Sequence, residues 1–238
     1  MKEDVSKSKG LLIAGEGELL RKLFQAIRHK DFATVQKMLE KTPSLVACVA
    51  EQPPKKDDGQ SPLQVALKTG NFEIANLLLD LGADVNFMED ENSCNEWRAP
   101  VIHDAIMAAV MCCRWNNVMN NVEVEVQSSK AEADEAFSVL RRIIDMGADV
   151  NAVDSFGNSC VWRVCLDARQ ILPRYHYGEK KEEMDRILTP ELKEDLGRIF
   201  DLLYDHGMDD TYICPGTMAR SVREFFKDES VVQFLRTK

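Results

Sequence analysis

The apolar positions of this chain recur at helical spacing in short blocks that polar turns separate, and residues 59–86 form the clearest block. Ser61 can cap a helix start and Pro62 suits the first helical position, while Gly82 can adopt the left-handed angles that end a helix. Two short apolar helices lie between these signals: Leu63, Val65, Ala66 and Leu67, then Ile74, Ala75, Leu77, Leu78 and Leu79. Because two short helices cannot bury both apolar faces alone, the block predicts neighbours of the same kind.

The same block resembles a known family. Ser61-Pro62-Leu63-Gln64-Val65-Ala66 stands where ankyrin repeats have T-P-L-H-x-A, and Gly82-Ala83-Asp84-Val85-Asn86 matches their exit turn. The resemblance implies an all-α solenoid of stacked helix-turn-helix units. It also implies a concave face, lined by the first helices and the turn tips, that binds other proteins.

Partial copies of this block occur on both sides of it. The units that we expect span residues 18–49, 59–86, 99–151, 157–210 and 216–237. His103 stands at the family's His position in the third unit, where the resemblance implies hydrogen bonds between neighbouring turns. Trp162 stands there in the fourth unit, and an indole cannot copy the acceptor of a His ring. We therefore expect Trp162 to be packed in the core and this junction to depart from the family.

The spacing of the exit turns predicts insertions. Gly82, Gly147 and Gly207 stand 65 and 60 residues apart, whereas ankyrin repeats have a period of about 33 residues. Segments at about 115–130 and 168–188 account for the surplus, inside the third and fourth units. Residues 122–126 alternate like a short strand, but an isolated strand is marginal, so we expect the first insertion to be loop-like.

These signals together predict one fold. We expect a flexible tail at residues 1–17, followed by a single ankyrin-like solenoid domain over residues 18–238. It would hold about five stacked repeats, with insertions between the helices of repeats three and four.

Composition and charge narrow the partners. The chain of 238 residues has a formal net charge of −10, which disfavours nucleic acid as a partner because a phosphate-binding surface needs clustered Lys and Arg. No apolar run approaches the roughly 18 residues that indicate a membrane span, and the N-terminus lacks the apolar core of a signal peptide. The 7 cysteines show no disulfide framework. We expect a cytoplasmic protein.

No catalytic residue, metal site or cofactor site stands out. Cys112 and Cys113 are adjacent, and Cys160 and Cys165 would lie on different faces of a helix, so neither pair suits a shared metal. The chain has no nucleophile elbow, phosphate-binding loop or dinucleotide fingerprint. We therefore expect a non-enzymatic protein without a cofactor.

Six residues are the candidates for partner binding. Trp and Arg are frequent hot spots, which favours the connector before the third unit, and charged residues on first helices can face the concave groove. The six residues are Trp97, Arg98, Asp104, Arg163, Asp167 and Lys68. For the charged residues the alternative is ordinary solvation, and for Trp97 it is a ring that caps the adjacent core.

The leading hypothesis is a non-catalytic, monomeric module that binds a protein partner through its concave face, turn tips and insertions. A partner with a basic patch would suit the net charge. The alternative is an enzyme or small-molecule binder with a pocket formed by the insertions, supported by Tyr175, His176 and Tyr177 beside Lys180 and Lys181. A bacterial effector or immunity-type inhibitor is a third possibility.

Overall fold

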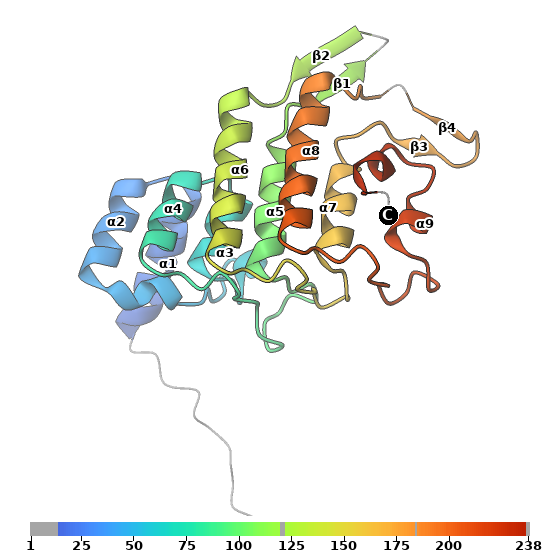
Figure 1. Cartoon of the computed structure of the whole chain (residues 1–238). Coiled ribbons are helices and arrows are strands. Elements are labelled where there is room, and N and C mark those ends of the chain that lie inside the picture. Colours follow the sequence, from blue (N-terminus) through green and yellow to red (C-terminus); the bar gives the residue numbers. More distant parts are fainter. Residues whose placement is uncertain (1–13, 120–121, 184, 237–238) are drawn as a thin grey trace, which may run out of the picture.

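The computed structural model describes residues 14–119, 122–183 and 185–236, and helices are the main regular structure in this part of the chain (Figure 1). The prediction of a mainly α-helical protein is confirmed. Residues 1–13 of the expected tail lie outside the described residues. Residues 14–17, which we also placed in the tail, belong to the first helix, because α1 begins at Ala14.

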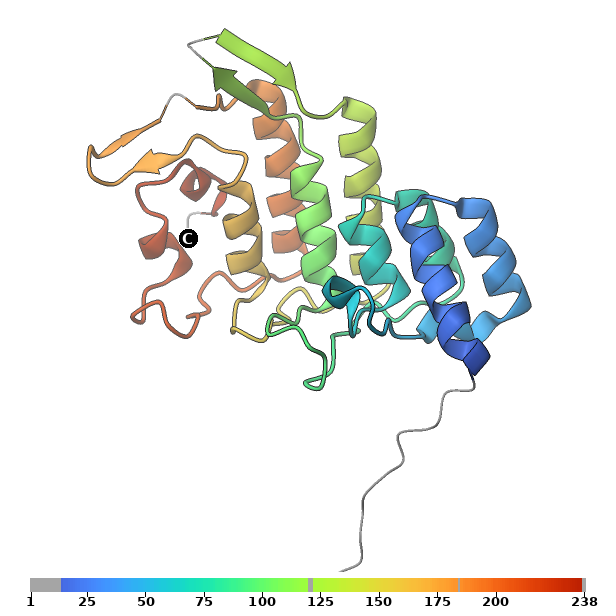
Figure 2. The same cartoon turned by 180° about the vertical axis from the view of Figure 1, so that it is seen from behind.

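Eight helices form two rows. The inner row holds α1 (Ala14–Arg28), α3 (Pro62–Lys68), α5 (Val101–Met111) and α7 (Cys160–Ala168). The outer row holds α2 (Phe32–Lys41), α4 (Phe72–Asp80), α6 (Lys130–Asp145) and α8 (Pro190–Asp205). Each helix packs against its neighbours within its row, and each inner helix from α1 to α5 packs against the outer helix that follows it in the chain. Figures 1 and 2 show the helices side by side along the molecule.

Short elements complete the chain. The 3₁₀ turns η1 (Pro43–Ala47) and η2 (Lys55–Asp57) follow α2, while α9 (Val222–Phe225) and η3 (Ser230–Phe234) come after α8. The cap predicted at Ser61 is present, because Ser61 Oγ accepts from Gln64 N at 3.2 Å. Thr189 caps α8 in the same way, with its Oγ1 accepting from Leu192 N at 3.1 Å. Gly82 and Gly147 end α4 and α6 with φ of 81° and 95°, a region that favours glycine.

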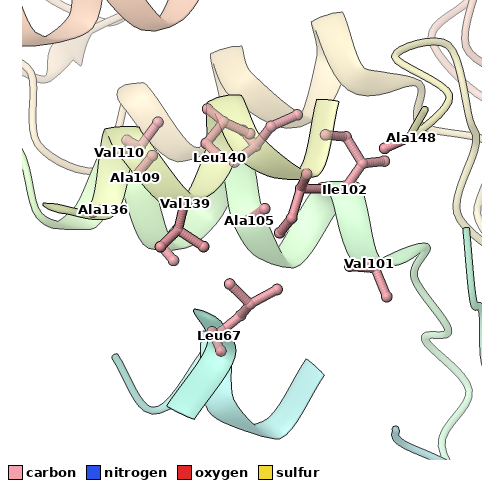
Figure 3. Close-up of a cluster of buried hydrophobic side chains, with 14 of the residues drawn as sticks. Leu67, Val101, Ile102, Ala105, Ala109, Val110, Ala136, Val139, Leu140 and Ala148 are labelled. Carbon is pink, nitrogen blue, oxygen red and sulfur yellow. The ribbon is translucent and has the colours of Figure 1, made fainter. Parts of the chain in front are cut away.

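The core lies between the rows. Figure 3 shows its centre, where Leu67 of α3 points toward α5 and α5 packs on α6. Three alanines, Ala105, Ala109 and Ala136, stand at this contact, and all are buried. Small side chains let helix axes approach closely, so large residues such as Leu140 and Ile102 fill the remaining space.

Two hairpins interrupt the helix pairs. Strands β1 (Asn116–Met119) and β2 (Val122–Val126) pair antiparallel between α5 and α6, and β3 (Tyr175–His176) pairs with β4 (Lys181–Glu182) between α7 and α8. The prediction of a loop-like segment at 115–130 is wrong, because residues 116–119 supply the partner strand that we missed. The hairpin also has a neighbour: Val118 N donates to Asp185 O at 2.8 Å.

Three different side chains tie the inner helices to the next connector. Gln64 Nε2 donates to Ala99 O at 2.9 Å, and His103 Nε2 lies 3.1 Å from Ala152 O. Trp162 Nε1 donates to Tyr212 O at 3.2 Å. Trp162 is buried as predicted, but the expected departure at its junction is absent. A carbonyl needs only a donor, and the indole N–H supplies one.

Candidate functional site

A groove of about 470 Å³ opens on the inner row, between the turn after α2 and the connector that precedes α5. Its lining includes Arg28 from α1, Lys68 and Thr69 at the end of α3, Met107 from α5, and Trp97. Two of the residues predicted to bind a partner, Lys68 and Trp97, therefore line the same cavity. We call it the Trp97 groove.

The connector holds Trp97 in a fixed position. Its indole Nε1 donates to Asp154 Oδ2 at 3.0 Å, and the neighbouring Arg98 N donates to Ser155 Oγ at 3.0 Å. The backbone returns a bond, because Ser155 N donates to Arg98 O at 3.0 Å. Two connectors that lie 57 residues apart in sequence thus form one unit around the Trp97 ring.

Asp154 is the anchor of that unit, and sequence reasoning missed it. It is buried, and it accepts from the backbone N–H groups of Phe156 and Asn158, each at 2.9 Å. Burial alone raises the pKa of Asp154, but hydrogen bonds from Asn158 and Trp97 outweigh this effect and hold the pKa below its ordinary value. The signal in the sequence was the turn Asp154-Ser155-Phe156-Gly157, in which an Asp side chain commonly binds the backbone N–H groups that follow it.

Two cations lie against the Trp97 ring. Lys68 Nζ lies 5.4 Å from the ring centroid and the guanidinium carbon of Arg163 lies 5.7 Å from it. Both distances are within the range of cation–π attraction. Lys68 comes from α3 and Arg163 from α7, so the ring links two inner helices that α5 separates.

Each of the two cations also lies against a buried carboxylate. Lys68 Nζ lies 3.5 Å from Asp104 Oδ1 and 3.6 Å from Glu89 Oε1. Arg163 forms a bidentate pair with Asp167, with Nε donating to Oδ2 at 2.9 Å. Glu89 has a second partner, because its Oε2 accepts from Ala99 N at 2.8 Å. Glu89 is a second residue that sequence reasoning missed, since its connector position gave no periodic signal. We use the name Trp97 cluster for the ring, its two cations and the carboxylates around them: Trp97, Lys68, Arg163, Glu89, Asp104, Asp154 and Asp167.

The carboxylates are buried enough to change their proton affinity. Burial raises the pKa of Asp104 to about 7, against the opposing attraction of Lys68. Burial likewise raises the pKa of Asp167 to about 6. His103 shows the opposite sign, because burial disfavours the imidazolium and lowers its pKa to about 4. His103 is therefore neutral at pH 7 and its Nε2 carries the proton that Ala152 O accepts.

The structure brings five of the six predicted residues together and divides their roles. Trp97, Lys68 and Arg163 are partly exposed at the surface of the cluster. Asp104 and Asp167 are fully buried, so the expectation that they face the groove is wrong. Neither carboxylate reaches the surface, and each lies against a cation instead. Arg98 lies beside the cluster and joins it through its backbone.

The residues that supported a ligand pocket in the insertions lie together on the β3–β4 hairpin, where the Tyr175 and Tyr177 ring centroids are 5.0 Å apart and His176 pairs with Lys181. Tyr175 lines a separate cavity, whereas His176, Lys180 and Lys181 are exposed on the β3–β4 hairpin. Tyr177 donates its hydroxyl to Glu229 Oε1 at 2.6 Å.

Two further features bear on chemistry. Across residues 14–119, 122–183 and 185–236, no group of three or more His, Cys, Asp or Glu side chains converges as a metal site would require. In the same ranges no helix combines the length and apolar character needed to cross a bilayer.

Comparison with known proteins agrees with the geometry of the α3–α4 helix pair. Residues 58–90 match the family model described as "Ankyrin repeat", a range that contains α3, α4 and the exit turn. No curated protein shows significant similarity to the chain. The matched range ends inside the connector that carries Glu89 and Trp97, so the Trp97 groove is attached directly to the matched unit. Residues 58–90 of the protein thus match one ankyrin repeat.

Proposed function

We propose that this protein is a non-catalytic interaction module that binds a protein partner in the Trp97 groove. Five stacked ankyrin-like units (18–49, 59–86, 99–151, 157–210 and 216–237) would form one domain, with insertions in the third and fourth units. Ankyrin repeats generally mediate protein–protein interaction, and the described fold is compatible with such a stack.

The observation that carries the proposal is the Trp97 cluster itself. An aromatic ring flanked by Lys68 and Arg163 presents two of the residue types, Trp and Arg, that are enriched among the hot spots of protein interfaces. Buried carboxylates fix both cations before a partner arrives, so binding loses less side-chain entropy than it would with free cations. A purely structural ring would be covered, but Trp97 lines an open groove.

The groove also has the wrong lining for a typical small-molecule site. Such sites are mostly apolar with a few polar groups, whereas Arg28, Lys56, Lys68, Asn95 and Glu96 all line this groove. A polar, charged surface around one aromatic anchor is typical of the rim and centre of a protein interface.

Affinity purification from cells that express the protein tests the proposal. We expect the same partner to be recovered with wild type and with Leu81→Ala, which changes an apolar residue, 46% exposed, at the end of the outer helix α4. Trp97→Ala should lower recovery at least about ten-fold, as the loss of an interface hot spot does. Recovery that Trp97→Ala leaves unchanged, in a variant that remains folded by circular dichroism, would refute the groove as the binding surface.

A further inference from the structure

A second cavity, of about 460 Å³, lies where the β3–β4 hairpin meets the C-terminal unit. Three arginines line it, Arg169, Arg174 and Arg186, together with Gln170, Tyr175 and Glu229. The arginines come from three places: the end of α7, the start of the hairpin and the segment before α8. We call this the arginine cavity.

Each of the three guanidinium groups is paired with a carboxylate of this chain. Arg169 Nε lies 3.1 Å from Glu229 Oε2, and Arg174 Nε donates to Asp185 Oδ2 at 2.6 Å. Arg186 Nη1 donates to the same Asp185 oxygen at 2.8 Å. Aromatic rings support two of the arginines from below: the guanidinium carbon of Arg169 lies 5.6 Å from the Phe226 centroid, and that of Arg186 lies 5.5 Å from the Trp115 centroid.

Most of the donors of these arginines remain unused. A guanidinium carries five N–H donors in a planar fork. Within the described ranges, no hydrogen bond uses either Nη of Arg169 or Arg174, or Nη2 of Arg186. Arg186 Nε is buried and also lacks a partner there. Planar forks with free N–H groups match the oxygens of an anionic group.

A ligand of this cavity must compete with the negative charge of the carboxylates that already contact the arginines. Glu229 is almost fully buried, and its two oxygens are engaged by Arg169 and Tyr177. Asp185 is engaged by Arg174 and Arg186, and Glu183 Oε2 lies 3.5 Å from Arg174 Nε. A ligand with a single carboxylate offers no more charge than these residues. A phosphate group offers about −1.5 to −2 charges and three acceptor oxygens, so it can bind the free forks while the internal pairs persist.

The arginine cavity continues the surface of the Trp97 groove. Arg163, Leu166 and Arg169 follow one another at three-residue spacing along and just beyond α7, which places them on one side of the helix. Arg163 contacts Trp97, and Leu166 and Arg169 line the arginine cavity. A partner that lies on the Trp97 ring can therefore reach the arginines.

We propose that the arginine cavity is a phosphate site that binds a phosphorylated side chain of the protein partner. The identity of the carrier rests on the proposed function, whereas the affinity for phosphate rests on the three arginines alone. Free phosphate shares the chemistry, so the test must separate the two sources.

NMR of the arginine Nε–Hε signals in the full chain provides the readout. The probes are inorganic phosphate, O-phospho-L-serine and O-phospho-L-tyrosine, each compared with sodium chloride at equal ionic strength. We expect saturable shifts of Arg169, Arg174 and Arg186 with all three probes, and tighter binding of at least one phosphoamino acid than of inorganic phosphate. Signals that move no further than in sodium chloride would overturn the site. Binding of inorganic phosphate alone would overturn the phosphorylated side chain as its ligand.

Variants locate the effect. Arg174→Gln and Arg186→Gln should each weaken phosphate binding about ten-fold, as expected for lost hydrogen bonds to a charged group. Arg236→Gln is the matched control, because Arg236 also lies between two carboxylates, Asp201 and Asp205 of α8, and does not line the arginine cavity. Equal affinity in wild type and both cavity variants would refute the proposal. Trp97→Ala should leave the titration unchanged, so a failure of partner binding cannot be mistaken for a failure of the phosphate site.

Discussion

At the scale of single residues, one position in three units performs the same task with three chemistries. Gln64, His103 and Trp162 each offer an N–H to the carbonyl of the following connector. Position along the first helix decides this role, since an amide, an imidazole and an indole can each supply the N–H. The bond fixes each connector against its own inner helix, and the connectors in turn carry Trp97 and Asp154.

Removal of the Trp162 donor tests this role. Trp162→Phe keeps an aromatic ring but leaves the Tyr212 carbonyl without its bond, so we expect a loss of about 1–3 kcal/mol in the free energy of unfolding. Trp115→Phe is the control, because Trp115 Nε1 has no hydrogen-bond partner in the described part of the chain. Chemical denaturation of both variants measures the difference. Equal losses would show that the Trp162 bond contributes nothing specific.

The buried Asp104 predicts a second effect at this scale. Its folded pKa of about 7 lies above the ordinary value, so the folded state binds more protons than the unfolded state between roughly pH 4 and 7. Asp104 therefore opposes folding increasingly as pH rises through this window. His103 acts with the opposite sign, because its pKa is lowered to about 4. Because the two contributions oppose each other, neither can be read from the pH dependence of the wild-type free energy of unfolding alone.

Comparison with Asp104→Asn isolates the carboxyl group. We expect the free energy of unfolding of the variant, minus that of wild type, to rise between pH 4 and 7. Its slope should be at most about 1.4 kcal/mol per pH unit. Urea denaturation across this range measures it, and Asp228→Asn, an exposed carboxyl, serves as the control. A difference that does not depend on pH would contradict a raised pKa at Asp104.

At the scale of elements, one buried ion pair joins the first hairpin to the outer row. Arg114 lies between α5 and β1, and its Nε donates to Asp195 Oδ2 of α8 at 2.9 Å. Its backbone N–H donates to the same oxygen, also at 2.9 Å. Asp195 is buried, so this pair fixes the direction in which the hairpin leaves α5.

Two substitutions on α8 compare a buried pair with an exposed one. Asp195→Ala leaves Arg114 without its buried carboxylate, and we expect a loss of about 3–5 kcal/mol. Asp201→Ala removes an exposed partner of Arg236 on the same helix, with an expected loss of about 0–1 kcal/mol. Thermal unfolding of the two variants separates the cases. Similar losses would mean that the Arg114 pair does not anchor the hairpin.

The elements also show what a sequence can predict. Helix periodicity and caps such as Ser61 are local signals, and they located the helix pairs. The β1–β2 hairpin was not predicted because Asn116–Met119 shows no alternation, and its contact with Asp185 comes from far along the chain. Of the side chains around Trp97, the sequence suggested Lys68, Asp104, Arg163 and Asp167 but missed Glu89 and Asp154, and it did not indicate which of them are buried. Asp104 and Asp167 are both buried, and the spacing of residues along one helix does not indicate that.

At the scale of the whole molecule, the net charge of −10 does not describe the groove. The outer helices α4, α6 and α8 carry eleven acidic and five basic residues. On α3, α5 and α7 the partly exposed charges are Lys68 and Arg163, and the carboxylates Asp104 and Asp167 are buried beneath them. A basic patch on the partner would therefore suit the outer row, whereas the inner row presents cations around Trp97.

Site-specific photo-cross-linking tests the central claim most directly. A photoreactive phenylalanine analogue would replace Thr69 or Met107 in the Trp97 groove, or Leu81 or Met146 at the ends of outer helices. We expect one discrete protein adduct from both groove positions, lost when Trp97→Ala is added, and none from the outer positions. Adducts that form only from Leu81 or Met146, or that persist in the Trp97→Ala background, would contradict the assignment of the groove as the partner-binding surface.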